Sequence, residues 1–412
     1  MELGVPISAG GPSVSHLLYA DDILFFAGAS IPNVKKINAI LEDYCSWTGQ
    51  RVNNGKSAIL FSKRTSSTTR SRLAKMIGCC KVAEMEYLGV KLALRRLSRK
   101  DFTPLIQKAR ACTLSWGIRH LSLAGQVTLI NSVLLPLSVY MVTHTGVQRA
   151  VLNDIEKICH SFFWDRHATH KSMHYTSWES MVRPRCKGGL GFHTGDNWVG
   201  PLRARITWEF ICKPLELFQK YMRHKYGDNP WHYDGRKGSS ICWKIICEGA
   251  HFILKGIGWN RPKLLLCFGE LLVDIICGIS IENGLSTYSI EMVKSPLGST
   301  ISTMVYNSCF MEDDDPICLI FKIRMRPRKK LFWWRLYKDN IPTNGWLCRR
   351  CLSADSSCPL GCGEVEDINH ITCNCKKLRD VLTVLENWGL VVPRFCSFDE
   401  LWDSIGKFAD MR

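Results

Sequence analysis

The stretch HLLYADDILFF, residues 16–26, places two neighbouring carboxylates, Asp21 and Asp22, inside an apolar run. An ionised carboxylate in an apolar environment costs free energy unless a partner compensates it, and adjacent carboxylates also repel each other. A surface turn would explain the pair, and so would a bound cation. Mg²⁺ favours carboxylate oxygens, and two such ions about 4 Å apart can activate a hydroxyl and stabilise the leaving oxygen of a phosphoryl transfer. The pair is therefore a candidate catalytic magnesium site.

A second candidate centre lies in the cysteine-rich stretch CPLGCGEVEDINHITCNC, residues 358–375. Thiolate and imidazole ligands at these spacings suit a tetrahedral Zn²⁺ ion, and Pro359, Gly361 and Gly363 supply the tight turn that two ligands of one ion require. A group of free thiols is the alternative. The preferred zinc ligands are Cys358, Cys362, His370 and Cys375.

The segment FKIRMRPRKKLFWWRLYK, residues 321–338, combines cationic and aromatic side chains. Cations that contact phosphates beside rings that stack on bases suit single-stranded nucleic acid or structured RNA. A helix with a solvated basic face and a buried aromatic face is the alternative, and the two are compatible. The candidate nucleic-acid-binding residues here are Arg326, Arg328, Lys329, Lys330 and Trp333.

The composition favours an intracellular chain with a polyanionic partner. Lysine and arginine number 54 against 37 acidic residues among 412, which gives a net charge of +17. Such a charge favours nucleic acid, and less strongly an anionic membrane surface. No secretory signal is visible, so most of the 20 cysteines are expected to be reduced thiols and the location intracellular, with the nucleus as a candidate. The best membrane-span candidate, residues 264–281, carries two acidic residues, so we expect no membrane span.

The elements that must position these groups belong to a small α+β module followed by helices. Residues 16–26 read as strand, tight turn, strand; residues 33–47 have a helical period that Gly49 ends; and residues 57–62 return to strand character, before a polar linker over 62–72. Helical patterns dominate from Phe102 to Trp259. We therefore expect a partial sheet module over 1–100, a helical connecting region over 101–300 and a small zinc-binding domain over 301–412.

The motifs in this order resemble those of a known family. YADD, residues 19–22, with apolar residues on both sides, resembles the catalytic hairpin of reverse transcriptases. GQRVNNGKS, residues 49–57, resembles the next motif of the polymerase palm, and EYLGV, residues 86–90, resembles the primer-grip turn. LSLAGQVTLINSVLLPLSVYMV, FFWD, HYTSW and CKGGLGF then follow as in the polyproteins of LINE-type (non-LTR) retrotransposons, especially those of plants.

This resemblance implies an RNA-directed DNA polymerase that adds deoxynucleotides to a DNA primer on an RNA template with Mg²⁺. It implies that Asp21 and Asp22 bind the metal and that Tyr19 lies near the primer terminus. It also implies that Lys56 protonates or stabilises the departing pyrophosphate, whereas the residue alone reads as one more solvated lysine. The first 100 residues then form the end of a palm, and the helices form a thumb-like region.

One departure from the family concerns the metal site. The family requires a further aspartate from an upstream strand, and Glu2 is too close in sequence to the hairpin to replace it. We therefore expect an incomplete magnesium site and no polymerase activity from this chain alone. No ribonuclease H segment is apparent. The alternatives are a non-catalytic, zinc-containing nucleic-acid-binding protein and an unstable retroelement remnant whose exposed edge strands favour aggregation. The oligomeric state is open.

The cysteine-rich stretch resembles the zinc-binding domain that follows these reverse transcriptases. In that domain a PKxxxFxWR segment, here residues 327–335, precedes ligands in the order Cys, Cys, His, Cys. Three residues separate Cys358 from Cys362, where the family has two. This insertion leaves Cys373 as a rival to Cys375 and leaves Cys348 and Cys351 as further candidate ligands.

Overall fold

The computed structural model describes residues 3–115, 121–164, 173–231, 238–256, 300–310 and 315–410. The chain divides into two compact units, each assembled from separate segments: Met1–Pro104, Ser138–Leu152 and Gly195–Cys309 in the first, and Leu105–Leu137, Asn153–Thr194 and Phe310–Arg412 in the second. The three consecutive domains expected from the sequence stay a prediction. The span candidate at residues 264–281 lies outside the described residues.

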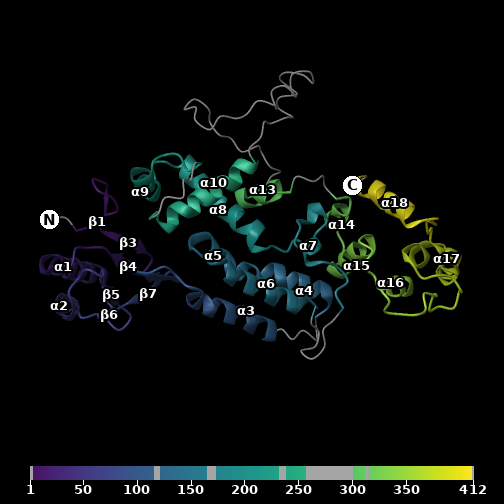
Figure 1. Cartoon of the computed structure of the whole chain (residues 1–412), viewed down its shortest axis with the longest axis horizontal. Coiled ribbons are helices and arrows are strands. Elements are labelled where there is room, and N and C mark those ends of the chain that lie inside the picture. The colour runs from purple at the N-terminus through teal and green to yellow at the C-terminus, as the bar shows by residue number, and fades with distance from the viewer. Residues whose placement is uncertain are drawn as a thin grey trace, which may run out of the picture. The chain divides into compact units, whose positions relative to one another are not determined.

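The predicted strand–turn–strand at the aspartate pair is present in the first unit (Figure 1). Strands β3 (His16–Tyr19) and β4 (Asp22–Phe25) pair antiparallel, with Tyr19 opposite Asp22. Ala20 in the turn has a left-handed backbone (φ 50°). The apolar flanks of the acidic pair therefore form a hairpin, as their β-favouring residues indicate.

Helix α1 (Ile31–Thr48) follows, as the apolar period predicts. The Ser30 side chain accepts a hydrogen bond from the Asn33 N–H at its start, and Gly49 takes the left-handed conformation at its end (φ 71°). Ser at the N-cap and Gly just after the last turn satisfy backbone groups that a helix end leaves open. Strand β5 (Ala58–Leu60) comes next.

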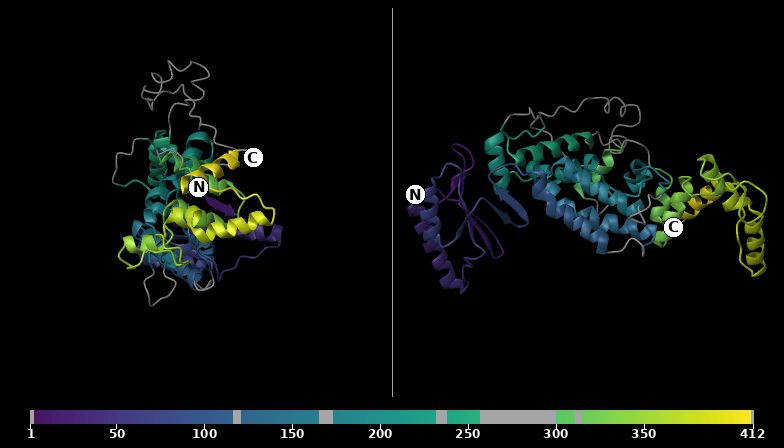
Figure 2. Two further views of the ribbon diagram at one scale, coloured as in Figure 1. Left: turned by 90° about the vertical axis from the view of Figure 1, so that its right-hand side faces the viewer. Right: turned by 60° about the horizontal axis from the view of Figure 1, so that its bottom comes forward.

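The linker predicted over residues 62–72 is partly wrong, because helix α2 (Ser67–Ile77) begins inside it. Ser66 caps the start and Gly78 (φ 79°) ends the helix. Each sheet among the described residues has two strands. Figure 2 shows the short strands near the N-terminus. The remaining pairs are β1 (Val5–Pro6) with β2 (Ser13–Val14), β5 with β6 (Cys80–Val82), and β7 (Glu84–Tyr87) with β8 (Val90–Ala93).

The rest of the first unit is helical, and its core lies between α8 (Gly195–Cys212), α10 (Ile241–Gly256) and α13 (Ile301–Ser308). Buried Phe210 and Ile246 belong to one apolar cluster, and Ala204, Ile253 and Val305 form another. Figure 1 shows these helices side by side. The unit also contains α5 (Pro136–His144), the start of α6 (Arg149–Trp164), α9 (Leu217–Tyr226) and a short helical turn, η1 (Arg99–Phe102).

A buried arginine ties residues 138–152 to these helices. Arg203 of α8 donates from Nε to the Val142 carbonyl oxygen at 3.1 Å and from Nη2 to the Thr145 carbonyl oxygen at 2.9 Å. It also pairs with Glu248 of α10. The Arg203 side chain is only 7% exposed, and these partners compensate the burial of its charge.

The second unit is built around α4 (Leu123–Leu129), which continues through a π-helical turn, η3 (Ile130–Leu134), and packs against α15 (Pro327–Tyr337). Trp334 of α15 donates its indole N–H to the Gly188 carbonyl oxygen at 2.9 Å. Gln126 of α4 donates to the Phe162 carbonyl oxygen at 3.1 Å. The other elements are α3 (Thr103–Ser115), α7 (Trp178–Met181), η4 (Arg185–Lys187), α14 (Cys318–Lys322), α16 (Asn344–Arg349), η5 (His370–Asn374), α17 (Lys376–Asn387) and α18 (Phe398–Asp410).

The structure as a whole confirms the predicted α+β class, with short two-stranded sheets, a mostly helical middle region and a Cys/His cluster near the C-terminus. Among the described residues, Leu123–His144 is the one helical stretch with the length and apolar composition of a membrane span. Such a single stretch is weak evidence, because the core helix of a globular protein passes the same criteria.

Candidate metal centre

Four donor side chains converge in the second unit after α16. The sulfur atoms of Cys358, Cys362 and Cys375 and an imidazole nitrogen of His370 all lie within 4.8 Å of one another. Cys358, His370 and Cys375 are buried, and Cys362 is half-buried. This is the one group of three or more candidate ligands in the part of the chain that the structure describes.

A tight loop brings the first two cysteines together. The Cys358 N–H donates to the Glu364 carbonyl oxygen at 2.8 Å, and Gly361 donates back to the Cys358 carbonyl oxygen at 3.0 Å. Gly361 and Gly363 have φ values of 75° and 80°, which side chains disfavour. The glycines that mark this loop in the sequence are therefore the residues that permit its reversal.

A π-helical turn positions the other two ligands. In η5 the Cys375 N–H donates to the His370 carbonyl oxygen at 2.8 Å, so the chain closes over five residues rather than four. Cys375 joins the donor group, whereas the thiol of Cys373 lies 3.4 Å from the Thr372 hydroxyl oxygen and outside that group. Cys348 and Cys351 are not members of the group either. Among the rival ligands left open by the sequence, the geometry favours Cys375.

Acidic residues between the cysteines and the histidine orient the imidazole. His370 Nε2 lies 3.1 Å from the sulfur of Cys362, and Nδ1 lies 3.2 Å from a carboxylate oxygen of Glu364. Asp367 accepts from the His370 backbone N–H at 2.7 Å. A carboxylate on the far nitrogen fixes the tautomer of a metal-ligating histidine. Sequence reasoning missed Glu364 and Asp367, and the signal was present in the run GEVEDINH.

A third carboxylate joins this loop to α16. Glu366 accepts from the Asn344 backbone N–H at 2.6 Å through its side chain, and its carbonyl oxygen accepts from the Gly345 N–H at 3.0 Å. A methyl group added at Gly345 would lie 2.6 Å from that carbonyl oxygen, so the close approach requires glycine. The metal loop is therefore anchored to the helix that precedes it.

The two thiols of the tight loop differ in their acidity. A hydrogen bond from the Glu364 backbone N–H is the main cause that lowers the pKa of Cys362 below its ordinary value. Burial is the main cause that raises the pKa of Cys358. Hydrogen bonding to the charged form stabilises a thiolate, and desolvation disfavours it. Cys362 is thus the more easily ionised of the two thiols.

The donor set fits zinc. Zn–S bonds of about 2.3 Å in a tetrahedron place neighbouring sulfur atoms about 3.8 Å apart, within the spread of these four donors. Three thiolates and one imidazole are a common structural zinc set, which a hard ion such as Mg²⁺ does not favour. His370 is 3% exposed, so the site is closed to solvent on that side. Such a site stabilises a fold and leaves no open position for a substrate.

The aspartate pair has different surroundings. Asp21 lies in the hairpin turn and Asp22 opens β4, and both are exposed. Neither belongs to a group of three or more candidate metal ligands among the described residues. Tyr19 beside them is 64% exposed, and Lys56 is exposed as well. The roles that the sequence suggests for these four residues stay predictions.

The basic segment is helical from Pro327, and its residues divide between solvent and the protein interior. Arg326, Arg328 and Lys329 are exposed, whereas Lys330 donates to the Phe321 carbonyl oxygen at 2.8 Å. The Trp333 ring is half-buried, with its centre 6.4 Å from that of Trp402 in α18. Three of the five predicted contacts are therefore free to meet a ligand, and two already have partners inside the chain.

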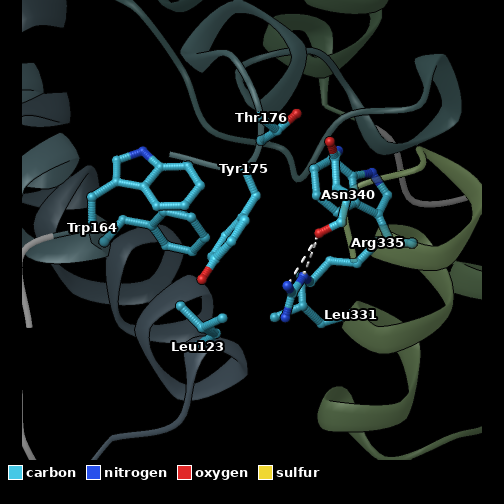
Figure 3. A pocket seen from close by; sticks show the side chains of 9 residues that line it. Leu123, Trp164, Tyr175, Thr176, Leu331, Arg335 and Asn340 are labelled. Carbon is cyan, nitrogen blue, oxygen red and sulfur yellow. Dashed lines mark hydrogen bonds between the residues drawn. The ribbon is translucent and has the colours of Figure 1, made fainter. Parts of the chain in front are cut away.

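The buried side of the same helix closes a small aromatic core (Figure 3). Arg335 donates to the Asn340 carbonyl oxygen at 3.3 and 3.1 Å, and its guanidinium lies 5.0 Å from the ring centre of Tyr175. In Figure 3 the Tyr175 ring lies between Trp164 and Arg335, and the cavity left among these residues is about 10 Å³. A space of this size holds about one water molecule, so the core is structural.

Comparison with known proteins points to reverse-transcriptase-related elements. Residues 301–381 match the family described as zinc-binding in reverse transcriptase. The chain is also 23% identical over 385 aligned residues to an Arabidopsis thaliana protein that carries the name of a ribonuclease H protein. That alignment covers 76% of this chain and 60% of the relative, so the chain spans about three fifths of the relative's length. The family match and the Cys/His cluster together support Zn²⁺ as the ion of this centre.

Proposed function

We propose that this chain is the downstream part of the RNA-directed DNA polymerase of a LINE-type retrotransposon. The observation that carries the proposal is the group of Cys358, Cys362, His370 and Cys375, which lies within the segment that matches the reverse-transcriptase zinc-binding family. The ordered motifs from YADD onward support it over the rest of the chain. The zinc site stabilises the C-terminal region, and the exposed cations hold nucleic acid close to it.

In this proposal Asp21 and Asp22 supply two carboxylates for the two-ion phosphoryl transfer that joins a deoxynucleotide to a DNA primer. Lys56 stabilises the leaving pyrophosphate, and Tyr19 lies beside the primer end. A magnesium cradle needs further ligands, which the described residues do not gather at the hairpin. Catalysis therefore depends on an additional palm segment with its own aspartate, and the chain alone is expected to be inactive.

Primer extension tests the proposal. The chain is assayed with Mg²⁺, a DNA primer on an RNA template and deoxynucleotides, alone and co-purified with a polypeptide that supplies the upstream palm strands. Extension is expected only in the second case, and Asp21→Asn or Asp22→Asn should abolish it. Asp43→Asn removes an exposed carboxylate from α1 and is the matched control. Extension that survives both hairpin substitutions would refute the assignment of these carboxylates.

A second candidate function is a non-catalytic, zinc-containing nucleic-acid-binding protein. The net charge of +17 and the exposed Arg326, Arg328 and Lys329 favour it. It predicts salt-dependent binding to RNA or DNA that survives replacement of both Asp21 and Asp22, with no extension under any condition. The third hypothesis, an unstable remnant, predicts aggregation and no cooperative unfolding of the purified chain. Under either of the first two functions we place the chain inside the cell, with the nucleus as the candidate compartment.

A further inference from the structure

A groove of about 620 Å³ runs along the second unit between two segments almost two hundred residues apart in sequence. One wall is α4 with the π-helical turn that follows it, and the other is the start of α15 from Arg326 to Arg328. Ligand-binding clefts span about 300–1,000 Å³, so its size fits a segment of a polymer or a small molecule. It is separate from the zinc centre, whose ligands do not line it.

One face of the α4 segment forms the first wall. Gly125, Thr128 and Ser132 recur at intervals of three and four residues, which places them along one side of the helix. Gly125 has no side chain, so a ligand can approach the helix backbone there. The hydroxyls of Thr128 and Ser132 donate to carbonyl oxygens of their own helix at 3.0 and 2.7 Å. Their oxygen lone pairs thus remain acceptors for a ribose hydroxyl or a base amino group.

The opposite wall is cationic. Arg326 and Arg328 are exposed, and their guanidinium groups make no hydrogen bond or ion pair with any residue that the structure describes. Among the described residues that line the groove, none is acidic. A guanidinium presents a planar fork of donors that matches phosphate oxygens, and the helix dipole adds positive potential at the start of α15. The groove therefore complements a phosphate-bearing ligand.

An exposed aromatic ring lies on α15 beyond the residues that line the groove. Phe332 lies four residues after Arg328, so the two occupy one side of α15, and its side chain is 52% exposed. Exposed rings beside cations form stacking platforms for unpaired bases. The combination of phosphate donors, acceptors for sugar or base, and an open ring favours a nucleic-acid strand over an isolated anion.

We propose that this groove holds a single strand of nucleic acid, with its phosphates on Arg326 and Arg328 and its sugars and bases against Gly125, Thr128 and Ser132. The inference rests on the proposed function, and it identifies where the chain binds an unpaired strand. A strand with splayed bases presents its Watson–Crick edges to these side chains, whereas in a duplex those edges are paired with the other strand. The first wall, α4, is a contact surface that the basic segment alone does not reveal.

Fluorescence anisotropy of the full chain with a labelled single-stranded RNA of about 12 nucleotides tests the proposal. Replacing both arginines (R326Q/R328Q) should lower the slope of log affinity against log salt by about 1.4, because each phosphate contact on a single strand contributes about 0.7. Thr128→Trp, which fills the groove from an exposed position and keeps every charge, should weaken binding about tenfold or more through lost base contacts.

Matched controls lie on α3 of the same unit. K108Q/R110Q removes two exposed charges outside the groove, and Leu114→Trp adds an indole at a position that is 80% exposed. Both should leave the affinity close to that of the unmodified chain apart from the general charge effect. Zinc content and circular dichroism establish that each variant is folded.

The outcomes distinguish failure of the groove proposal from failure of the proposed function. An unmodified chain that binds no RNA or DNA overturns both. Binding that K108Q/R110Q weakens as much as R326Q/R328Q, with no effect of Thr128→Trp, overturns the groove alone. Vesicles containing anionic lipid are the third arm. Binding to vesicles but not to RNA, lost in Thr128→Trp, would identify the groove as a membrane surface and overturn the proposal.

Discussion

Two buried cysteines of one turn, Cys373 and Cys375, allow a sharp test of the zinc centre. They lie two residues apart, with exposed fractions of 6% and 3%, and only Cys375 belongs to the donor group. Replacing Cys375 by serine should weaken zinc binding strongly, whereas Cys373→Ser should leave the stoichiometry at one ion per chain. The two substitutions remove the same atom type from similarly buried positions, so they differ chiefly in the metal contact.

The expected magnitude follows from the number of ligands. Structural zinc sites bind with about 10–16 kcal/mol at neutral pH, so one ligand of four accounts for about 3 kcal/mol. This corresponds to an affinity about a hundredfold lower. Because the apo loop holds Cys358 and Cys375 away from water with no ion between them, loss of zinc should also lower the thermal midpoint of the second unit. Cys373→Ser costs only its local packing, since its thiol contacts Thr372 and no ligand.

The assay is competition for zinc against a chromophoric chelator, with total zinc measured in the purified chain and the thermal midpoint recorded with and without a strong chelator. Chelation should lower the midpoint of the unmodified chain and of Cys373→Ser to that of Cys375→Ser. Equal zinc loss in both variants would refute the assignment of Cys375 by the π-helical turn. A zinc-free unmodified chain, reconstituted with zinc and still empty, would refute the centre itself.

Three further predictions concern stability. Arg203→Met should lower the free energy of unfolding by about 3 kcal/mol in urea titrations, because it leaves buried carbonyl oxygens without a hydrogen-bond donor. The control Arg205→Met removes an exposed ion pair with Glu209 and should lower the free energy of unfolding by at most about 0.5 kcal/mol. Gly345→Ala forces a methyl group against the Glu366 carbonyl oxygen at 2.6 Å and should weaken zinc retention during dialysis. Burial lowers the pKa of His193 from 6.5 to about 4, so between these pH values the unfolded chain binds a proton that the folded chain does not. The free energy of unfolding should therefore fall by up to about 3 kcal/mol as the pH drops from 6.5 to 4. In His193→Gln the free energy of unfolding should depend less on pH over this range.

Local signals predicted several elements well. The apolar period of residues 33–47 and the glycine after it predict helix α1. Both signals depend only on residues close together in the sequence, so they can be recognised without the tertiary structure. The β-favouring flanks of the acidic pair gave the hairpin for the same reason. Helix α2 was missed although Ser66 and Gly78 mark its ends. Its polar composition resembles that of a linker, and the packing of its buried Leu73 and Ala74 distinguishes the helix from a linker.

At the zinc centre the residue types predict the kinds of ligand but not which of two nearby cysteines binds the metal. The ligand types could be predicted from residues 358–375 and the tight turn from the glycines of residues 358–363, because both depend on local spacing. The choice between Cys373 and Cys375 depends on the π-helical turn that starts at His370, and nothing in the residue types indicates a turn of five rather than four. Two partners of buried Arg203 could likewise not be predicted, because they are backbone carbonyls of a segment some sixty residues away.

The two candidate metal sites differ in how many of their ligands one segment of the chain supplies. The Cys/His group brings all its ligands from a stretch of eighteen residues, and Glu366 within that stretch anchors it to the start of α16. The complete ligand set is therefore supplied by one short segment and its supporting helix. The hairpin supplies only Asp21 and Asp22, on a two-stranded ribbon whose Leu18 and Tyr19 are 60% and 64% exposed. An isolated two-stranded hairpin is marginal in water, so these apolar side chains would be stabilised by a further strand laid beside the ribbon. The magnesium site of the proposed function requires further ligands, and the same strand could carry them. Binding of such a strand would bury the apolar face and complete the carboxylate set at once, which is why folding and magnesium binding at the hairpin should be gained together or not at all.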